Sequence, residues 1–123
     1  MMSAFLQLTV RPLALTRDGG HIFENMVIME MVKCFAEKGE RAPLYFYRSS
    51  SGTEIDLIID RGSQLDAFEI KLSATPSMEM TRSLEQFKKE FPVKESALLC
   101  LRKESIPFTN GITACHWSCM MQA

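Results

Sequence analysis

The sequence carries almost no net charge. Fourteen Lys and Arg residues stand against fifteen Asp and Glu residues, which gives −1 at pH 7. A positive field over the whole protein, which would draw it onto nucleic acid or an anionic membrane, is therefore excluded. Any contact with nucleic acid must be local.

The sequence also lacks an apolar run that would cross a membrane. The uncharged start, Met1–Val10, has about half of the length that a bilayer requires and follows no basic region. The other uncharged stretch, Ser105–Ala123, is interrupted by Pro107, Gly111 and His116. We expect no signal peptide, no transmembrane helix, no membrane partner and a cytoplasmic location.

Glycine and proline are scarce, at six and five residues, whereas 46% of the residues are hydrophobic. This composition excludes a collagen-like repeat, a low-complexity linker and a disordered tail. A chain of 123 residues has room for one domain with its own core.

No CxxC pair is present among the four cysteines. Cys115-His116 and Cys119 look like metal ligands, but no second pair elsewhere in the sequence completes a site. We therefore expect no zinc, and reduced thiols in place of disulfides.

Apolar residues recur at intervals of three and four from Ile22 to Phe35, which predicts a buried helix of about four turns. Asp18–Gly20 offers its start and Gly39 its end. A second helix is predicted to open at Thr75-Pro76 and to end before Pro92.

Strand patterns separated by turn residues lie between and after these helices. The first three predict an antiparallel meander, and two more follow the second helix: Leu44–Arg48, Glu54–Ile59, Leu65–Leu72, Ala97–Leu101 and Ile112–Trp117. The resulting order is helix, three antiparallel strands, helix, strand. It predicts an α/β fold with a mixed sheet flanked by helices.

The middle strands carry the candidate functional residues. A symmetric hairpin around residues 61–64 pairs Asp60 with Leu65, and therefore Asp56 with Glu69. Alternation along the strands places Ile55, Leu57 and Ile59 on one face and both carboxylates on the other, with Lys71 two residues along.

Opposed like charges on a sheet cost stability, and two explanations stay open. Lys71 bridges Asp56 and Glu69 in an ordinary solvent-facing ion-pair cluster. Alternatively, the two carboxylates hold Mg²⁺ or Mn²⁺, and the lysine orients a water for attack on a phosphodiester.

Asp56 followed by Glu69-Ile70-Lys71, with Glu24 on a preceding helix, resembles the signature of the PD-(D/E)XK nuclease superfamily. The sequence from about residue 19 to the end is also similar to the C-terminal domain of many prokaryotic AAA+ type ATPases. That domain is catalogued as a domain of unknown function, family 4143. Five segments carry this resemblance: Gly20–Val27, Leu44–Arg48, Ser51–Ile58, Phe68–Lys71 and Ala74–Ser77.

The resemblance implies a restriction-endonuclease-like core over residues 19–123, attached to a P-loop ATPase. Residues 1–18 would be a remnant of an upstream segment. This sequence has no GxxxxGK[ST] motif, so we expect no ATP binding by this chain. It would be a detached C-terminal piece of such an ATPase.

The resemblance also implies the roles at the site. Asp56, Glu69 and the Ile70 carbonyl would hold the metal, and Lys71 would position the water. Glu24 would support the metal through a water, although a glutamate in the first helical turn is also favoured by the helix dipole.

Two functions remain as hypotheses. The first is metal-dependent hydrolysis of DNA, with Arg48 as a weak candidate for a phosphate contact. The second is a catalytically inactive docking module for DNA, for the missing ATPase portion or another protein, or for a second copy of the chain.

Overall fold

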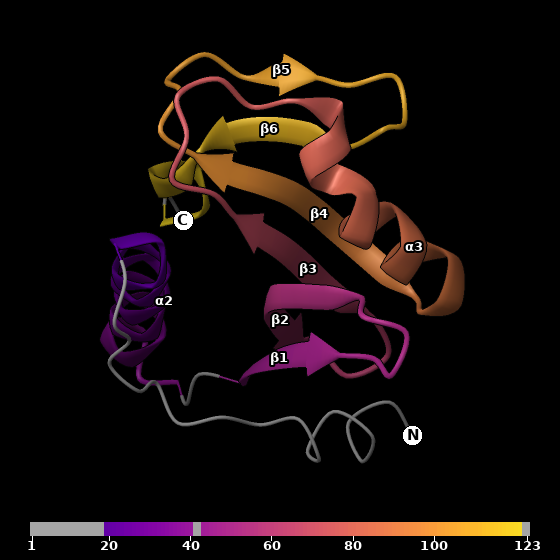
Figure 1. Cartoon of the computed structure of the whole chain (residues 1–123). Helices are drawn as coiled ribbons and strands as arrows, with labels where there is room; N and C mark the ends of the chain where they lie inside the picture. Colours follow the sequence, from indigo (N-terminus) through magenta and orange to yellow (C-terminus); the bar gives the residue numbers. More distant parts are fainter. Residues whose placement is uncertain (1–18, 41–42, 122–123) are drawn as a thin grey trace.

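The computed structural model describes residues 19–40 and 43–121 (Figure 1). Residues 1–18, interpreted above as an upstream remnant, lie outside the described part. Within it, the chain forms a six-stranded mixed sheet and two α-helices. The α/β class is confirmed, and so is the order of helix, three strands, helix, strand.

The strands follow the order β1-β2-β3-β4-β6-β5 across the sheet. Their bounds are β1 Leu44–Arg48, β2 Glu54–Asp60, β3 Leu65–Ile70, β4 Val93–Cys100, β5 Ile106–Pro107 and β6 Thr113–His116. The predicted meander is confirmed, because β2 pairs antiparallel with both β1 and β3. β4 then runs parallel to β3, and β6 parallel to β4. The short edge strand β5 was not predicted, because its two residues include a proline that breaks any strand pattern.

Helix α2, Gly19–Glu37, is the first predicted helix. Gly39 follows it with φ 74°, the left-handed conformation that glycine adopts readily at the end of a helix. The helix buries Phe23, Val27 and Met31 against one face of the sheet. No helix in the described ranges is long and apolar enough to span a membrane.

The predicted start of the second helix at Thr75-Pro76 is wrong. A 3₁₀ turn, η1, begins at Met78 and runs to Thr81, and α3 follows from Arg82 to Glu90. Ser77, directly before η1, has φ −129° and ψ 159°, so the chain is still extended after Pro76. The predicted end is confirmed, since Phe91 is already extended and Pro92 follows it.

Helix α3 covers the face of the sheet opposite to α2. On β3, Phe68 belongs to the α2 cluster whereas Leu65 and Ala67 belong to the α3 cluster, as alternation along a strand requires. Phe87 of α3 stacks on Phe91 at 4.5 Å between ring centroids. Each face of the sheet therefore packs against its own apolar core, and the sheet lies between the two cores (Figure 1).

One expectation about β2 is wrong, and the reason is a β-bulge. Tyr45 pairs with Ile58 and Tyr47 with Ile55, so Phe46 alone stands opposite both Asp56 and Leu57. The extra residue shifts by one position the alternation of β2 side chains between the two faces of the sheet. Ile55 therefore packs in the α3 cluster with Ile58, whereas Leu57 and Ile59 pack in the α2 cluster.

Candidate functional site

The two predicted metal-binding carboxylates come from β2 and β3. The hairpin has the predicted register: Asp60 pairs with Leu65, and the ladder continues to Leu57 opposite Phe68. The ladder ends there, and Asp56 and Glu69 are the next residues along the two strands. Asp56 is also one of the two residues in the bulge, so the candidate site lies where the regular ladder ends.

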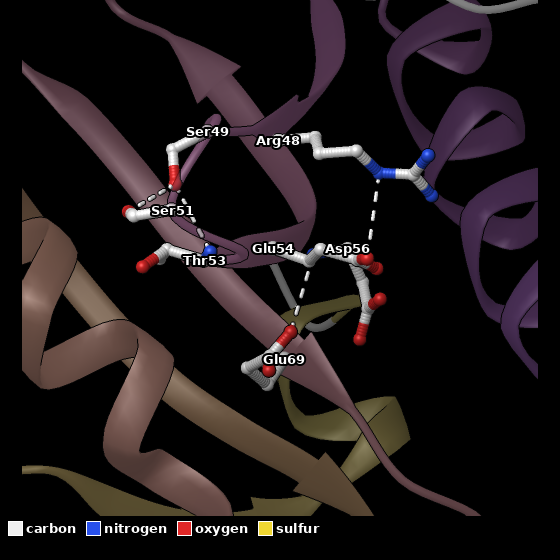
Figure 2. A network of polar contacts seen from close by, with 7 residues as sticks. All are labelled: Arg48, Ser49, Ser51, Thr53, Glu54, Asp56 and Glu69. Atoms are coloured by element: carbon white, nitrogen blue, oxygen red, sulfur yellow. Dashed lines mark hydrogen bonds and ion pairs between the residues drawn. The ribbon is translucent and has the colours of Figure 1, made fainter.

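The carboxyls replace ladder hydrogen bonds at this point. The Asp56 backbone N–H donates to Oε1 of Glu69 at 3.2 Å, as Figure 2 shows. The Ile70 backbone N–H donates to Oδ2 of Asp56 at 2.8 Å. These crossed bonds fix both side chains against each other and leave one oxygen of each carboxyl outside them.

Glu69 is buried, with 6% of its surface exposed. Burial, the negative charge of Asp56 and a hydrogen bond between the two side chains raise the pKa of Glu69 to about 9. The charge of Lys71 and the bond from the Asp56 backbone act in the opposite direction on that pKa. Burial and the neighbouring carboxyl therefore favour the protonated form of Glu69 when no metal is bound.

Lys71 lies just beyond the end of β3, not within it as predicted. Its backbone N–H still donates to the Leu99 carbonyl at 2.9 Å, which continues the pairing with β4. Its residue is exposed, whereas Glu69 is buried. The ordinary surface cluster proposed above therefore fits poorly, because one of its two carboxylates is not solvent-facing.

Ile70 contributes its side chain to the α2 cluster and its N–H to Asp56. Its carbonyl as a metal ligand stays a prediction. Glu24 is half-buried on α2. It lies more than one turn inside the helix, because α2 begins at Gly19 and has no acidic residue in its first turn. The dipole explanation for Glu24 is therefore wrong, and its support of a metal stays a prediction.

Arg48, the candidate phosphate contact, ends β1. Its Nε lies 3.3 Å from Oε2 of Glu54, its register partner on β2, and both side chains are 56% exposed (Figure 2). An exposed pair of this kind contributes little stability. An approaching phosphate would therefore compete with Glu54 for this guanidinium.

The donor set at Asp56 and Glu69 consists of oxygen atoms, which suits Mg²⁺ or Mn²⁺. In the described ranges, no group of three or more His, Cys, Asp or Glu side chains is placed to hold a metal ion. The structure thus brings two carboxyls together but does not add Glu24 to them. A cation with one or two protein carboxylates and several waters, the usual arrangement for Mg²⁺, fits such a pair.

Sequence reasoning missed a second buried acid, Asp66, which is 2% exposed. Its Oδ2 accepts from Nε of Arg61 at 2.8 Å, and its Oδ1 accepts from the Glu95 backbone N–H at 3.3 Å. The available signal was its position two residues before Phe68, in the alternation of the core-facing side chains. Because its partners are an arginine and a backbone N–H, this acid has a structural role.

A cavity near the C-terminal end of the described chain also escaped the sequence analysis. It has a volume of about 330 Å³ and is lined by Lys103, Ser105, His116, Ser118 and Cys119. Nδ1 of His116 lies 2.7 Å from the Ser118 hydroxyl, so the ring is held by a neighbour within the cavity wall.

No curated protein and no solved structure matches this chain. Residues 19–120 match a family described as Domain of unknown function (DUF4143). Since this match covers most of the sequence, the chain belongs to the DUF4143 family.

Proposed function

We propose that this domain is a PD-(D/E)XK-like, metal-dependent phosphodiesterase acting on DNA, and that it is the C-terminal part of an AAA+ type ATPase. The observation that carries the proposal is the meeting of the Asp56 and Glu69 carboxyls at the bulge in β2. Bulges are common next to active sites, where they redirect a side chain.

A buried acid pair of this kind has a chemical cost that a cation would remove. Two carboxylates in contact cannot both ionise easily, and Glu69 is already deprived of water. A divalent cation would displace the proton and satisfy both negative charges at once. The crossed backbone bonds hold the carboxyl groups in place without using all of their oxygens.

Asp56 and Glu69 would hold the Mg²⁺ or Mn²⁺, with the Ile70 carbonyl as a further ligand. The bound cation would supply charge stabilisation for the phosphate and lower the pKa of a water. Lys71, exposed beside Glu69, would hold the attacking water by donating from its ammonium. Arg48 would orient the strand by a phosphate contact, and Glu24 would bind a water in the outer sphere.

The test is nicking of supercoiled plasmid DNA in Mn²⁺ by the whole chain and by Lys71→Ala. We expect the variant to lose activity by a factor of about 10² or more, because the water-positioning group is missing. Lys88→Ala, which changes an exposed lysine on α3, is the matched control and should nick as the unmodified chain does. Equal activity of Lys71→Ala and the unmodified chain would contradict the proposal.

A second candidate, a docking module without catalysis, is favoured by the outer side of α2. Ile22, Met26 and Met29 are exposed there, at the spacing of one helical stripe. Such a stripe suits self-association or docking to the ATPase portion. A chain that sediments as a monomer, both unmodified and as Met26→Lys, would count against self-association.

A further inference from the structure

The cavity of about 330 Å³ lies at the carboxyl ends of two neighbouring parallel strands. Lys103 and Ser105 belong to the segment between β4, which ends at Cys100, and β5. His116 is the last residue of β6 and pairs with Cys100. In open α/β sheets, ligands bind outside the carboxyl ends of the strands. The cavity therefore occupies a place in the fold that suits a ligand.

Lys103 supplies positive charge to the cavity, and none of the described lining residues is acidic. Its ammonium forms no ion pair within the described ranges. The next residue, Glu104, does not line the cavity, and its Oε1 lies 3.9 Å from Nε of Arg102. That Nε is buried and has no hydrogen-bond partner among the described residues. An anion in the cavity would therefore meet a lysine whose charge no described carboxylate neutralises.

The β6 side of the cavity adds hydrogen-bond donors. Ser118 lies in the 3₁₀ turn η2, Trp117–Met121, and its backbone N–H donates to Nδ1 of His116 at 3.3 Å. Its hydroxyl lies 2.7 Å from the same nitrogen. With Nδ1 accepting, a neutral ring carries its proton on Nε2, and a protonated ring carries one there as well. The imidazole can therefore donate from Nε2 in both states, and the Ser105 hydroxyl is a further donor.

We propose that this cavity is a phosphate-binding site, and that it takes a phosphate group of the DNA strand that Asp56 and Glu69 would cleave. Lysine ammonium groups and serine hydroxyls commonly contact phosphate oxygens. The first part of the proposal rests on the cavity and its donors alone. The second part rests on the proposed function.

The cavity and the carboxylate site share one edge of the sheet. Glu69 pairs with Leu98 of β4, and Leu98 pairs with Ala114 of β6. His116 follows Ala114 by two residues, so alternation places its side chain on the same face as that of Glu69. The arrowheads of β3, β4 and β6 point towards the same edge in Figure 1. One bound strand could therefore reach both places.

The distance between the two sites suits a strand that contacts both. Two strand spacings of about 4.8 Å and a rise of about 3.3 Å per residue put the backbones of Glu69 and His116 on the order of 10 Å apart. DNA advances about 3.4 Å per nucleotide along its axis, so the two sites would contact phosphates about three nucleotides apart. The cavity would thus position the strand without touching the bond that breaks.

The first test is a titration of the full chain with inorganic phosphate, in chelator and at constant ionic strength. Trp117 is the only tryptophan of the sequence, and its ring centroid lies 5.4 Å from that of His116. Its emission therefore reports on the cavity. We expect a saturable change in emission with phosphate but not with chloride, and a higher melting temperature in phosphate.

Three variants show whether the cavity is the site. Lys103→Ala should weaken phosphate binding by a factor of about ten or more, whereas Lys103→Arg should keep most of the affinity. Lys94→Ala is the matched control, because it removes an exposed lysine at the amino end of β4. Phosphate that changes neither the emission nor the melting temperature would overturn the proposal, as would equal affinities of Lys103→Ala and the unmodified chain.

The second test measures binding of a fluorescent single-stranded DNA oligonucleotide by anisotropy in Mn²⁺. Lys71→Ala is the background, so that the strand is not cleaved. Adding Lys103→Ala should weaken binding about tenfold and reduce the slope of log affinity against log salt by about 0.7, the value for one phosphate contact on a single strand. Adding Lys94→Ala should change neither.

The outcomes separate this proposal from the proposed function. Phosphate binding that depends on Lys103, together with oligonucleotide binding that does not, would overturn the second part and leave a site for free phosphate. A chain that passes both tests but never nicks plasmid DNA would refute the phosphodiesterase and still support the phosphate site.

Discussion

The buried Glu69 carboxyl should make the stability of the domain depend on pH in one direction. Its pKa is raised to about 9 in the folded chain by burial and by Asp56, whereas the unfolded chain has the ordinary value of 4.5. Between these values the folded state binds one more proton than the unfolded state. The stabilisation is therefore complete below pH 4.5 and is lost as the pH rises towards 9.

The size of this effect follows from proton linkage. One extra proton in the folded state gives a slope of about 1.4 kcal/mol per pH unit. From pH 6 to pH 8 the free energy of unfolding should therefore fall by roughly 3 kcal/mol from this group alone. For a domain of this length, that is about 10 °C in melting temperature.

Glu69→Gln is the variant that isolates this contribution. The amide is neutral at every pH, its oxygen still accepts from the Asp56 N–H, and its NH₂ donates to the Asp56 carboxylate. Glu54→Gln, which neutralises an exposed acid on the same strand pair, is the matched control.

Thermal melts of the three proteins at pH 6 and pH 8, in chelator, provide the measurement. The unmodified chain and Glu54→Gln should lose about 10 °C more than Glu69→Gln does between the two pH values. If Glu69→Gln loses as much as the unmodified chain, Glu69 does not hold a proton in the fold, and the account of the acid pair is wrong.

Three further changes test the site and the fold by thermal melts. In Mn²⁺ at ten times its dissociation constant, the unmodified chain should gain about 1.4 kcal/mol of stability, or roughly 5 °C in melting temperature, whereas Asp56→Asn should gain little. In chelator that variant should melt at the same temperature or higher, because the charge of residue 56 that disfavours an ionised Glu69 is removed. A less stable variant beside a metal-insensitive parent would instead favour the ion-pair cluster. Asn110→Ala should cost about 2 kcal/mol of stability, because the buried Thr81 hydroxyl loses the Asn110 amide that donates to it at 2.8 Å. Asn110→Asp still accepts from the Ile112 N–H but cannot donate to Thr81, so it should also destabilise the domain. An unchanged melting temperature in either variant would contradict this account. Gly111→Ala should cost about 1 kcal/mol through its φ of 86° alone, since no atom lies within 4 Å of the added Cβ; an unchanged melting temperature would show that the turn relaxes.

Local patterns in the sequence determined most of the fold. The apolar spacing from Ile22 onward located α2, and the turn residues between Arg48 and Leu65 located the meander. The pairing of Asp60 with Leu65 followed from the length of the turn between them. Because hairpin register depends on neighbouring residues, the sequence was enough to set the pairing from Asp60 opposite Leu65 to Leu57 opposite Phe68.

Tertiary structure decided what those positions mean. No local pattern predicted the bulge at Asp56 and Leu57, because a bulge exists only when two residues of one strand lie opposite a single residue, here Phe46, of the neighbouring strand. The start of the second helix also depended on context: Thr75-Pro76 is a good helix opening, but the chain stays extended through Ser77 before η1 begins.

The chemistry of single groups depended on the same long-range packing. The sequence showed two opposed carboxylates, but only the folded chain buries Glu69, and this burial raises the pKa of its carboxyl. The same fold leaves Lys71 exposed. Burial and contact between elements are properties of the whole fold, whereas spacing and turn chemistry are properties of the local sequence, and this difference separates what each determined.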